Sequence, residues 1–121
     1  MCFQIHRDTG LWYSAEYSSF SLGPEADFYR LSVSGYSGDA GDAIAAPVNP
    51  LRIVNGRQFT TRDQDNDNKS GGICMNGYSG WWFNLCARST LNRWSNGVWN
   101  ADNDDNSIKD VVFSRMLVKL A

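Results

Sequence analysis

The acidic run DQDNDNKSGGIC, residues 63–74, is the most informative segment of this chain. Its aspartates, Asp63, Asp65 and Asp67, stand at alternate positions, and like charges this close repel one another unless something neutralises them. Ca²⁺ does so with carboxylate and main-chain carbonyl oxygens, and Gly71 and Gly72 let the backbone turn to present such carbonyls. The run therefore predicts a calcium loop, and the alternative is a solvated acidic loop.

The run does not have the pattern of an EF-hand. An EF-hand loop that begins at Asp63 requires Gly at its sixth position and Glu at its twelfth. This chain has Asn68 and Cys74 at those positions, and no amphipathic helical pattern flanks the run. A calcium loop here must belong to another class.

Length and charge limit the fold and the kinds of partner. A chain of 121 residues is long enough for one domain with a sizeable core. A formal net charge of −2 gives no reason to expect nucleic acid or an anionic membrane as a partner. No apolar run approaches the length of a membrane span. Residues 1–8 lack the apolar stretch of a secretion signal, so we expect either a signal outside this sequence or a fragment.

The three cysteines favour one disulfide. Cys74 and Cys86 bracket eleven residues, and closing a loop of that size is worth about 3 kcal/mol in the chain-entropy model. A disulfide indicates an oxidising compartment. Cys2 is left over, either as a free thiol or as a partner for a cysteine outside this sequence. There is no Cys-x-x-Cys pattern, and His6 is the only histidine, so we expect neither a zinc site nor an enzyme.

Alternating apolar residues predict a small twisted antiparallel sheet. Residues 29–33 and 112–120 alternate in this way, and the second of these strands is expected to close the core. Residues 58–61 are a short third candidate. Asp42 is expected to cap a short helix that ends before Pro47. The predicted fold class is α+β, with short helices and long loops.

Turns are expected where glycine follows a small polar residue. These positions are residues 34–38, 55–56, 76–77 and 96–97. A second acidic cluster at residues 102–105 is expected to be a solvated loop. The adjacent Trp81 and Trp82 would face opposite ways in a strand, and Trp81 is expected in the core.

Several segments together resemble the fibrinogen C-terminal (fibrinogen-related) domain family. They are LGPEADFYRL at 22–31, GYSGDAGDA at 35–43, NGRQFTTRDQDND at 55–67, GWWF at 80–83, and Cys86. They follow one another in the order and spacing of the family from about Trp12 to Leu120. The opening subdomain of the family is absent, so the resemblance implies a single truncated domain over residues 1–121.

The resemblance implies a calcium ion as cofactor, held by the side chains of Asp65 and Asp67. Two main-chain carbonyls before the cysteine complete the protein ligands. Counting forward from Asp67 places them at Lys69 and Gly71, and this is the assignment we favour, because the carboxylates anchor the loop. Counting back from the cysteine gives residues 70 and 72 instead, because the chain carries one extra residue.

The resemblance also implies a ligand pocket beside the calcium loop, built around the second cysteine. The expected lining residues are Leu85, Cys86, Ala87, Trp94 and Trp99, the two tryptophans serving as the aromatic wall. Members of the family typically have a cis peptide bond before this cysteine, which here is Leu85–Cys86. Ala87 stands where the family usually has histidine, so the ligand specificity is expected to differ.

The function implied by the resemblance is a secreted, extracellular, calcium-dependent lectin of innate immunity that binds acetylated carbohydrate or other acetylated groups. The alternative is a protein-binding adhesion or signalling module of the angiopoietin, tenascin or fibrinogen type, which the shortened pocket loop and Ala87 favour. Relatives multimerise through a preceding region that this sequence lacks, so a homo-oligomer is a possible state.

Overall fold

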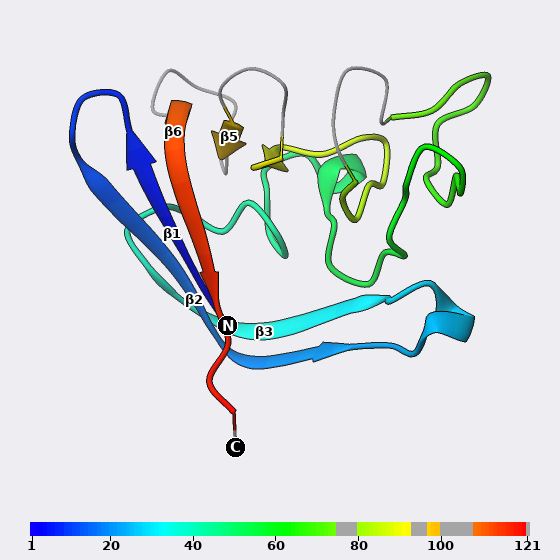
Figure 1. The fold of residues 1–121 in the computed structure, drawn as a ribbon, viewed down its shortest axis with the longest axis horizontal. Helices are drawn as coiled ribbons and strands as arrows, with labels where there is room; N and C mark the ends of the chain where they lie inside the picture. Colours follow the sequence, from blue (N-terminus) through cyan, green and yellow to red (C-terminus); the bar gives the residue numbers. More distant parts are fainter. Residues whose placement is uncertain (75–79, 93–96, 100–107, 121) are drawn as a thin grey trace.

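The computed structural model describes residues 1–74, 80–92, 97–99 and 108–120. Its strands form one antiparallel sheet in the order β3-β2-β1-β6-β5-β4. The strands are β1 (Cys2–Arg7), β2 (Trp12–Leu22), β3 (Leu31–Gly38), β4 (Ser89–Thr90), β5 (Gly97–Trp99) and β6 (Ile108–Leu117). In Figure 1 the sheet curls, and the long loops between β3 and β5 lie to one side of it.

The helical elements of the described residues are two short 3-10 helices, η1 (Glu25–Asp27) and η2 (Pro50–Arg52). The fold is therefore mostly strand and loop, and the expected α+β class is not confirmed. Asp42 does make the expected cap contact, since its Oδ1 accepts the N–H of Ala45 at 2.9 Å. Only a turn follows, because a segment closed off by Pro47 is too short to sustain an α-helix. No described helix is long and apolar enough to cross a membrane.

The centre of the sheet is β1, which lies between β2 and β6. Phe3 pairs with Ala15 on one side and with Met116 on the other. Side chains alternate between the two faces of a strand, so Phe3 and Ile5 point into the core while Gln4 and His6 point outward. The β1–β2 hairpin was missed at the level of sequence, although the alternation of Phe3 and Ile5 is a signal for it.

The strand expected at residues 112–120 is β6, which runs from Ile108 to Leu117, so the predicted bounds lie too late in the chain. The prediction of which residues close the core was also wrong. Ile108 and Val111 are the buried ones, whereas Val112 is 54% exposed and Met116 is 44% exposed. For Val111 and Val112 the cause is a β-bulge: β1 pairs through His6 with Phe113 but through the next residue with Val111. The extra residue, Val112, places Val111 on the core side in its stead. The bulge does not account for Met116, which pairs with Phe3 before the register shifts.

Two further local expectations were wrong. Residues 34–38 lie inside β3 and do not form a turn. Gly35 has φ +71° there, and a Cβ at this position would meet the side chain of Ser18 on β2, so glycine permits close strand pairing. The strand begins at Leu31 and not at Tyr29, because Tyr29 has φ +54° and still belongs to the turn after η1.

The remaining short-range predictions had mixed outcomes. The turn at Asn55-Gly56 is confirmed, with φ +80° at Gly56. The candidate strand at residues 58–61 is reduced to two isolated bridges, Thr60 with Trp81 and Thr61 with Gln64. Gly97 begins β5, while residues 76–77, residue 96 and the acidic cluster at 102–105 lie outside the described residues.

The core lies between the sheet and the loops that cover it. Trp81 is fully buried, as expected, and Trp82 is 7% exposed, so neither indole forms a surface platform. The two rings contact each other edge to face, and the indole N–H of Trp82 donates to the carbonyl of Tyr29 at 2.9 Å. These contacts hold the segment that leads into Cys86 against the body of the protein.

Candidate functional site

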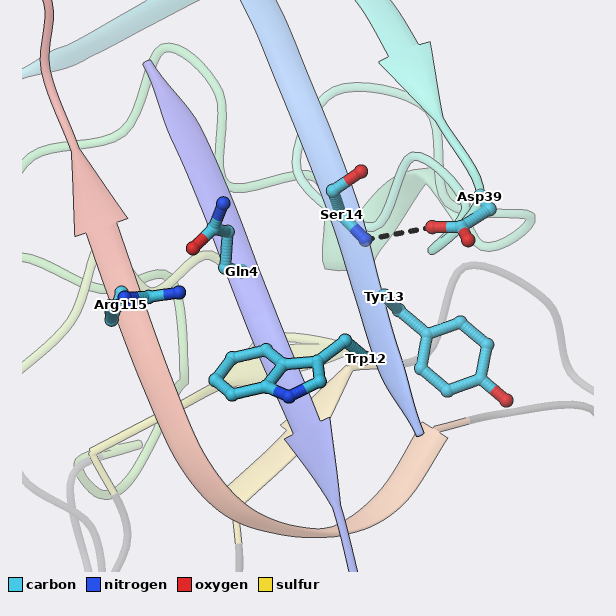
Figure 2. Close-up of a pocket in the computed structure, with 6 residues that line it drawn as sticks. All are labelled: Gln4, Trp12, Tyr13, Ser14, Asp39 and Arg115. Atoms are coloured by element: carbon cyan, nitrogen blue, oxygen red, sulfur yellow. Dashed lines mark hydrogen bonds between the residues drawn. The ribbon is translucent and has the colours of Figure 1, made fainter. Parts of the chain in front are cut away.

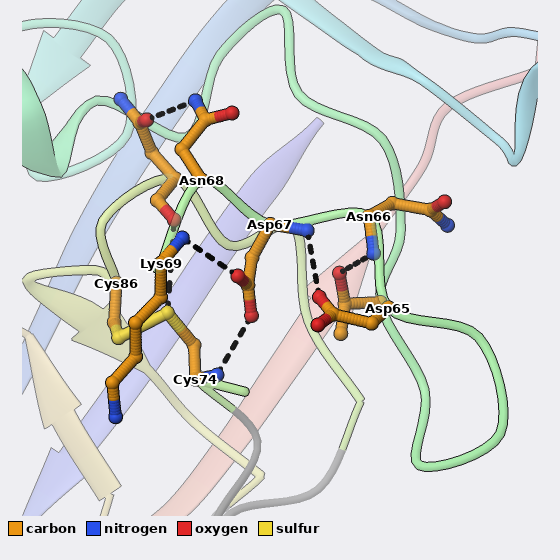
Figure 3. Close-up of a disulfide and its surroundings, with 9 residues drawn as sticks. Asp65, Asn66, Asp67, Asn68, Lys69, Cys74 and Cys86 are labelled. Carbon is orange, nitrogen blue, oxygen red and sulfur yellow. Dashed lines mark hydrogen bonds between the residues drawn. A yellow bond between two sulfur atoms is a disulfide. The ribbon is translucent and has the colours of Figure 1, made fainter. Parts of the chain in front are cut away.

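A disulfide joins the acidic run to the segment after Trp82. Cys74 and Cys86 are bonded, with their Cα atoms 5.3 Å apart, which confirms the pairing expected from their spacing (Figure 3). Cys2 is a free thiol in β1. Burial raises the pKa of this thiol, and the neighbouring carboxylate of Glu16 raises it further. Unlike Cys2, Cys74 and Cys86 link two predicted features, since their disulfide joins the predicted metal loop directly to the predicted pocket.

The aspartates of the run bond to main-chain N–H groups within the run itself. Asp67 accepts the N–H of Lys69 at 2.8 Å through one carboxylate oxygen and the N–H of Cys74 at 2.7 Å through the other. Asp65 accepts the N–H of Asp67 at 3.2 Å. These bonds shape the loop around two carboxylates, as Figure 3 shows.

Asp63 is held differently from the other two aspartates. Its carboxylate accepts the hydroxyl of Thr61 at 2.8 Å, before the run begins. This hydrogen bond lowers the pKa of the Asp63 carboxyl. Asp63 thus stabilises the turn at the start of the run.

The asparagines between the aspartates attach the run to the rest of the protein. The side chain of Asn66 donates to the carbonyl of Phe59 at 2.7 Å, and its N–H donates to the hydroxyl of Thr60 at 3.0 Å. The side chain of Asn68 donates to that of Asn84 at 2.7 Å. Sequence reasoning missed these anchors, although the regular alternation of Asp and Asn indicates two kinds of position.

The oxygen atoms of the acidic run are of the kind that a hard cation takes as ligands. Each carboxylate oxygen of Asp65 and Asp67 keeps a lone pair after the bonds above. Among the described residues, no donor reaches the main-chain carbonyls of residues 69–72. Carboxylates and free carbonyls are the ligands that Ca²⁺ takes. No group of three or more His, Cys, Asp or Glu side chains gathers in the described part of the chain, so a metal here would depend on the carbonyls.

A cavity of about 310 Å³ lies beside the disulfide. Its lining consists of the disulfide, apolar side chains, one threonine and three basic residues: Arg52, Lys69, Ile73, Cys74, Phe83, Cys86, Ala87, Arg88, Thr90 and Val98. The structure thus brings together two of the predicted pocket residues, Cys86 and Ala87, at one cavity. The three basic residues were not anticipated, although Arg88 follows closely after Cys86 in the sequence.

The other predicted pocket residues are placed differently. Leu85 is not in the lining, and its N–H donates to the carbonyl of Leu51 at 3.1 Å. Trp99 is fully buried, and its ring packs against that of Phe3 at a tilt, with 5.1 Å between ring centroids. Its indole N–H donates to the carbonyl of Gly41. Its indole therefore forms part of the core and not a pocket wall, because β5 pairs with β6 and turns the side chain inward. Trp94 lies outside the described residues.

The Leu85–Cys86 peptide bond does not have the expected conformation. The described residues contain no cis peptide bond, so this bond is trans. For a residue other than proline the trans form is favoured by about 2.5–4 kcal/mol. The main-chain N–H groups beside Cys86 are positioned accordingly, and Asn84 donates its own N–H to the Cys86 carbonyl at 2.7 Å.

A second cavity of about 280 Å³ lies on the outer face of the sheet. Figure 2 shows Trp12 of β2 reaching across β1 toward Arg115 of β6, whose guanidinium carbon is 5.1 Å from the centre of the ring. Trp12 also stacks on His6. Asp39 accepts the N–H of Ser14 at 2.7 Å on the far side of the cavity. The ring of Trp12 is engaged by its neighbours, so this cavity is the weaker candidate.

Comparison with known proteins identifies the family. The family described as fibrinogen beta and gamma chains, C-terminal globular domain, matches residues 1–114, a longer match at the start than the expected one from Trp12. Angiopoietin-related protein 6 of Mus musculus is 44% identical over 85 residues, which are 70% of this chain and 16% of that protein. Fibrinogen-like protein 1 of Rattus norvegicus is 38% identical over 96 residues, which are 75% of this chain and 31% of that protein. The chain thus spans less than a third of the length of these relatives.

Solved structures of fibrinogen-type domains also superpose on this chain. The fibrinogen-like globe domain of human ANGPTL2 superposes with a TM-score of 0.71 and 32% identity, over 89% of this chain and 52% of that one. Lamprey fibrin D-dimer, complexed with the peptide ligand Gly-His-Arg-Pro-amide, superposes with a TM-score of 0.74 and 25% identity, over 98% of this chain and 46% of that one. The chain belongs to the fibrinogen C-terminal domain family.

Proposed function

We propose that this chain is an extracellular recognition module of the fibrinogen type that binds protein ligands in the cavity beside the Cys74–Cys86 disulfide. The observation that carries the proposal is the cavity itself, which is walled by both cysteines and by the end of the acidic run. The relatives are angiopoietin-related and fibrinogen-like proteins, and a similar structure carries a peptide ligand. The disulfide is consistent with an oxidising, extracellular setting.

Calcium is the second part of the proposal. Ca²⁺ would be held by the carboxylates of Asp65 and Asp67 and by the carbonyls of Lys69 and Gly71, with the carbonyls of residues 70 and 72 as the other possible pair. The ion would neutralise the two carboxylates and stiffen the loop. Its role would be structural. The ion would fix the Asp67 carboxylate, which accepts a hydrogen bond from the N–H of Cys74, and Cys74 in turn lines the cavity. Calcium would therefore affect ligand binding without touching the ligand.

An acetyl-binding lectin of innate immunity is the second candidate function. The apolar part of the lining, including Ile73 and Val98, supports it, because an acetyl methyl group needs a small apolar surface. The names of the relatives favour protein recognition, and we place that first.

The decisive experiment selects ligands without assuming their chemistry. A library of random peptides displayed on phage is panned against the immobilised 121-residue chain in calcium, and in parallel the chain is passed over N-acetylglucosamine resin. We expect enriched peptides that no longer bind an Ala87→Trp variant, whose cavity is filled, but still bind a Ser32→Trp control on the exposed face of β3. Retention on the resin with release by free sugar, and no enriched peptide, would support the lectin function instead.

A further inference from the structure

We propose that the cavity beside the disulfide binds the carboxylate of an acidic peptide. The proposal rests on the proposed function, because it specifies the ligand of the same cavity. Its starting point is that three basic residues line the cavity from separate parts of the chain. Arg52 ends η2, Lys69 lies in the acidic run, and Arg88 follows the second cysteine. No aspartate or glutamate is among the described residues of the lining.

These cations are not neutralised within the described part of the protein. The salt bridge found there joins Arg30 to Asp27, away from the cavity. Arg52, Lys69 and Arg88 make no side-chain hydrogen bond to any described residue, and the Nε of Arg88 is buried without a partner. Three like charges around one hollow repel one another, and a buried guanidinium N–H without an acceptor is unfavourable. An anionic ligand would relieve both effects.

The carboxylate of Asp67, close by in the acidic run, forms no ion pair with these cations in the described part of the chain. Both oxygens of Asp67 accept main-chain N–H groups, from Lys69 and from Cys74, and so hold this carboxylate within the loop. Figure 3 shows the side chain of Lys69 running past the disulfide and away from the Asp67 carboxylate. Lys69 lines the cavity, and the end of its side chain lies near Gly72.

The remaining lining residues favour acidic peptides over other anions. Guanidinium groups bind carboxylates with two parallel hydrogen bonds, and Arg52 and Arg88 both supply such a fork. Ile73, Phe83 and Val98 provide apolar surface for the methylene stem of an acidic residue and for an apolar neighbour. A sulfated sugar would place its hydroxyl groups against this apolar surface, which offers them no hydrogen bonds. A volume of about 310 Å³ admits one side chain or chain end, and not a folded partner.

The same charges disfavour a cationic ligand. The peptide Gly-His-Arg-Pro-amide, bound in the lamprey fibrin structure, carries an amino terminus and an arginine and no carboxylate. Such a peptide would meet three positive charges in this cavity. We therefore expect this chain to prefer a ligand of the opposite charge.

The test uses the full 121-residue chain, labelled with ¹⁵N, in calcium. Four peptides are titrated by NMR: a blocked Leu-Glu-Leu peptide, its Leu-Gln-Leu counterpart, Leu-Ala with a free carboxyl end and a blocked amino end, and Gly-His-Arg-Pro-amide. We expect the two carboxylate peptides to bind with shifts at residues 69–74 and 86–90, and to bind about tenfold more tightly than the glutamine and cationic peptides. The two carboxylate peptides together distinguish a side chain from a chain end as the source.

Variants assign the effect to the cavity. Arg88→Gln and Arg52→Gln should each weaken binding of the preferred carboxylate peptide about tenfold, whereas Arg88→Lys should weaken it less, because charge is kept and only the fork is lost. Lys69→Gln removes the third positive charge of the lining, and it leaves in place the main-chain carbonyl of residue 69, which is a proposed calcium ligand. Arg62→Gln, an exposed residue outside the lining, is the matched control and should bind as wild type. Unchanged ¹⁵N spectra of the free variants away from the cavity establish that they fold.

The possible results separate this inference from the proposed function. Equal binding of the glutamate and glutamine peptides, or an Arg88→Gln variant that binds like wild type, overturns the inference. If phage-selected peptides still occupy the cavity in that case, the proposed function stands. A sulfated heparin tetrasaccharide that binds more tightly than the acidic peptides, with the same dependence on Arg88, also overturns the acidic peptide as the ligand.

Discussion

The carboxylate of Asp67 accepts the main-chain N–H of Cys74 at 2.7 Å. One residue of the acidic run is thereby fixed to the disulfide that walls the cavity. Its other oxygen accepts the N–H of Lys69, so one side chain sets the path of the chain between the two predicted carbonyl ligands and the cysteine. A change at Asp67 is expected to reach the cavity through this bond.

Removing Asp67 should destabilise the protein even without calcium. Asp67→Ala leaves the N–H groups of Lys69 and Cys74 without their acceptor, and each such loss costs about 1–3 kcal/mol when the group is shielded from water. Because the run is partly exposed, we expect a total loss at the low end of that range. Urea unfolding in EDTA measures it. An unchanged unfolding midpoint would contradict the structural role of this carboxylate.

Asp65 should affect the calcium response more than the metal-free protein. Its described contact within the loop is one bond of 3.2 Å to the N–H of Asp67, so Asp65→Ala should change the melting temperature in EDTA little. Added calcium should raise the melting temperature of wild type and of the Asp63→Ala control, and should no longer raise that of Asp65→Ala. Circular dichroism with and without calcium measures all three. A full calcium response in Asp65→Ala would show that the metal is held elsewhere.

The disulfide should contribute more to stability than the free thiol. Replacing both Cys74 and Cys86 with serine opens a loop of sequence separation 12, and the chain-entropy model gives a loss of about 3 kcal/mol. Cys2→Ser is the matched control and should be nearly neutral, because this thiol forms no disulfide. Urea denaturation in non-reducing buffer compares them. Similar losses in both variants would mean that the cysteines act through packing and not through the bond.

Trp99 should behave as a core residue. Its indole is fully buried against Phe3 and donates to Gly41, so Trp99→Ala should cost about 3–5 kcal/mol. Trp12 is 46% exposed, and Trp12→Ala should cost much less. Thermal unfolding compares the two variants. If Trp99→Ala kept wild-type stability and lost only peptide binding, the aromatic-wall role predicted from sequence would be restored.

The pair of Arg30 and Asp27 predicts a small dependence of stability on pH. Arg30 donates to the Asp27 carboxylate at 2.8 Å, and this bond, with a second from Gln58, lowers the pKa of Asp27 below its ordinary value of 3.8. Because the pKa is lowered in the folded state, the stabilisation is present above the ordinary value and is lost as the pH falls through the lowered one. The pair is exposed, so the effect is small. In Arg30→Gln, an NMR titration should find the Asp27 pKa raised; no change would rule out the ion pair as its cause.

The sequence alone determined the features that depend on residue type and local spacing. The family follows from short segments such as residues 35–43 and 55–67, because their residue types stand in the order and spacing of the family. The pairing of Cys74 with Cys86 follows from their separation along the chain. The turn at Asn55-Gly56 follows from the positive φ that glycine accepts.

Only the tertiary structure decided which side chains meet. The bulge between β1 and β6 buries Val111 and exposes Val112, and it arises from pairing two strands about a hundred residues apart along the chain. The same holds for the fate of Trp99, which pairing with β6 turns into the core. The charge of the cavity is non-local too, since Arg52, Lys69 and Arg88 are far apart in sequence and come together only where η2 and the disulfide converge. Local patterns carry no information on such contacts, because their energy exists only once the chain has closed on itself.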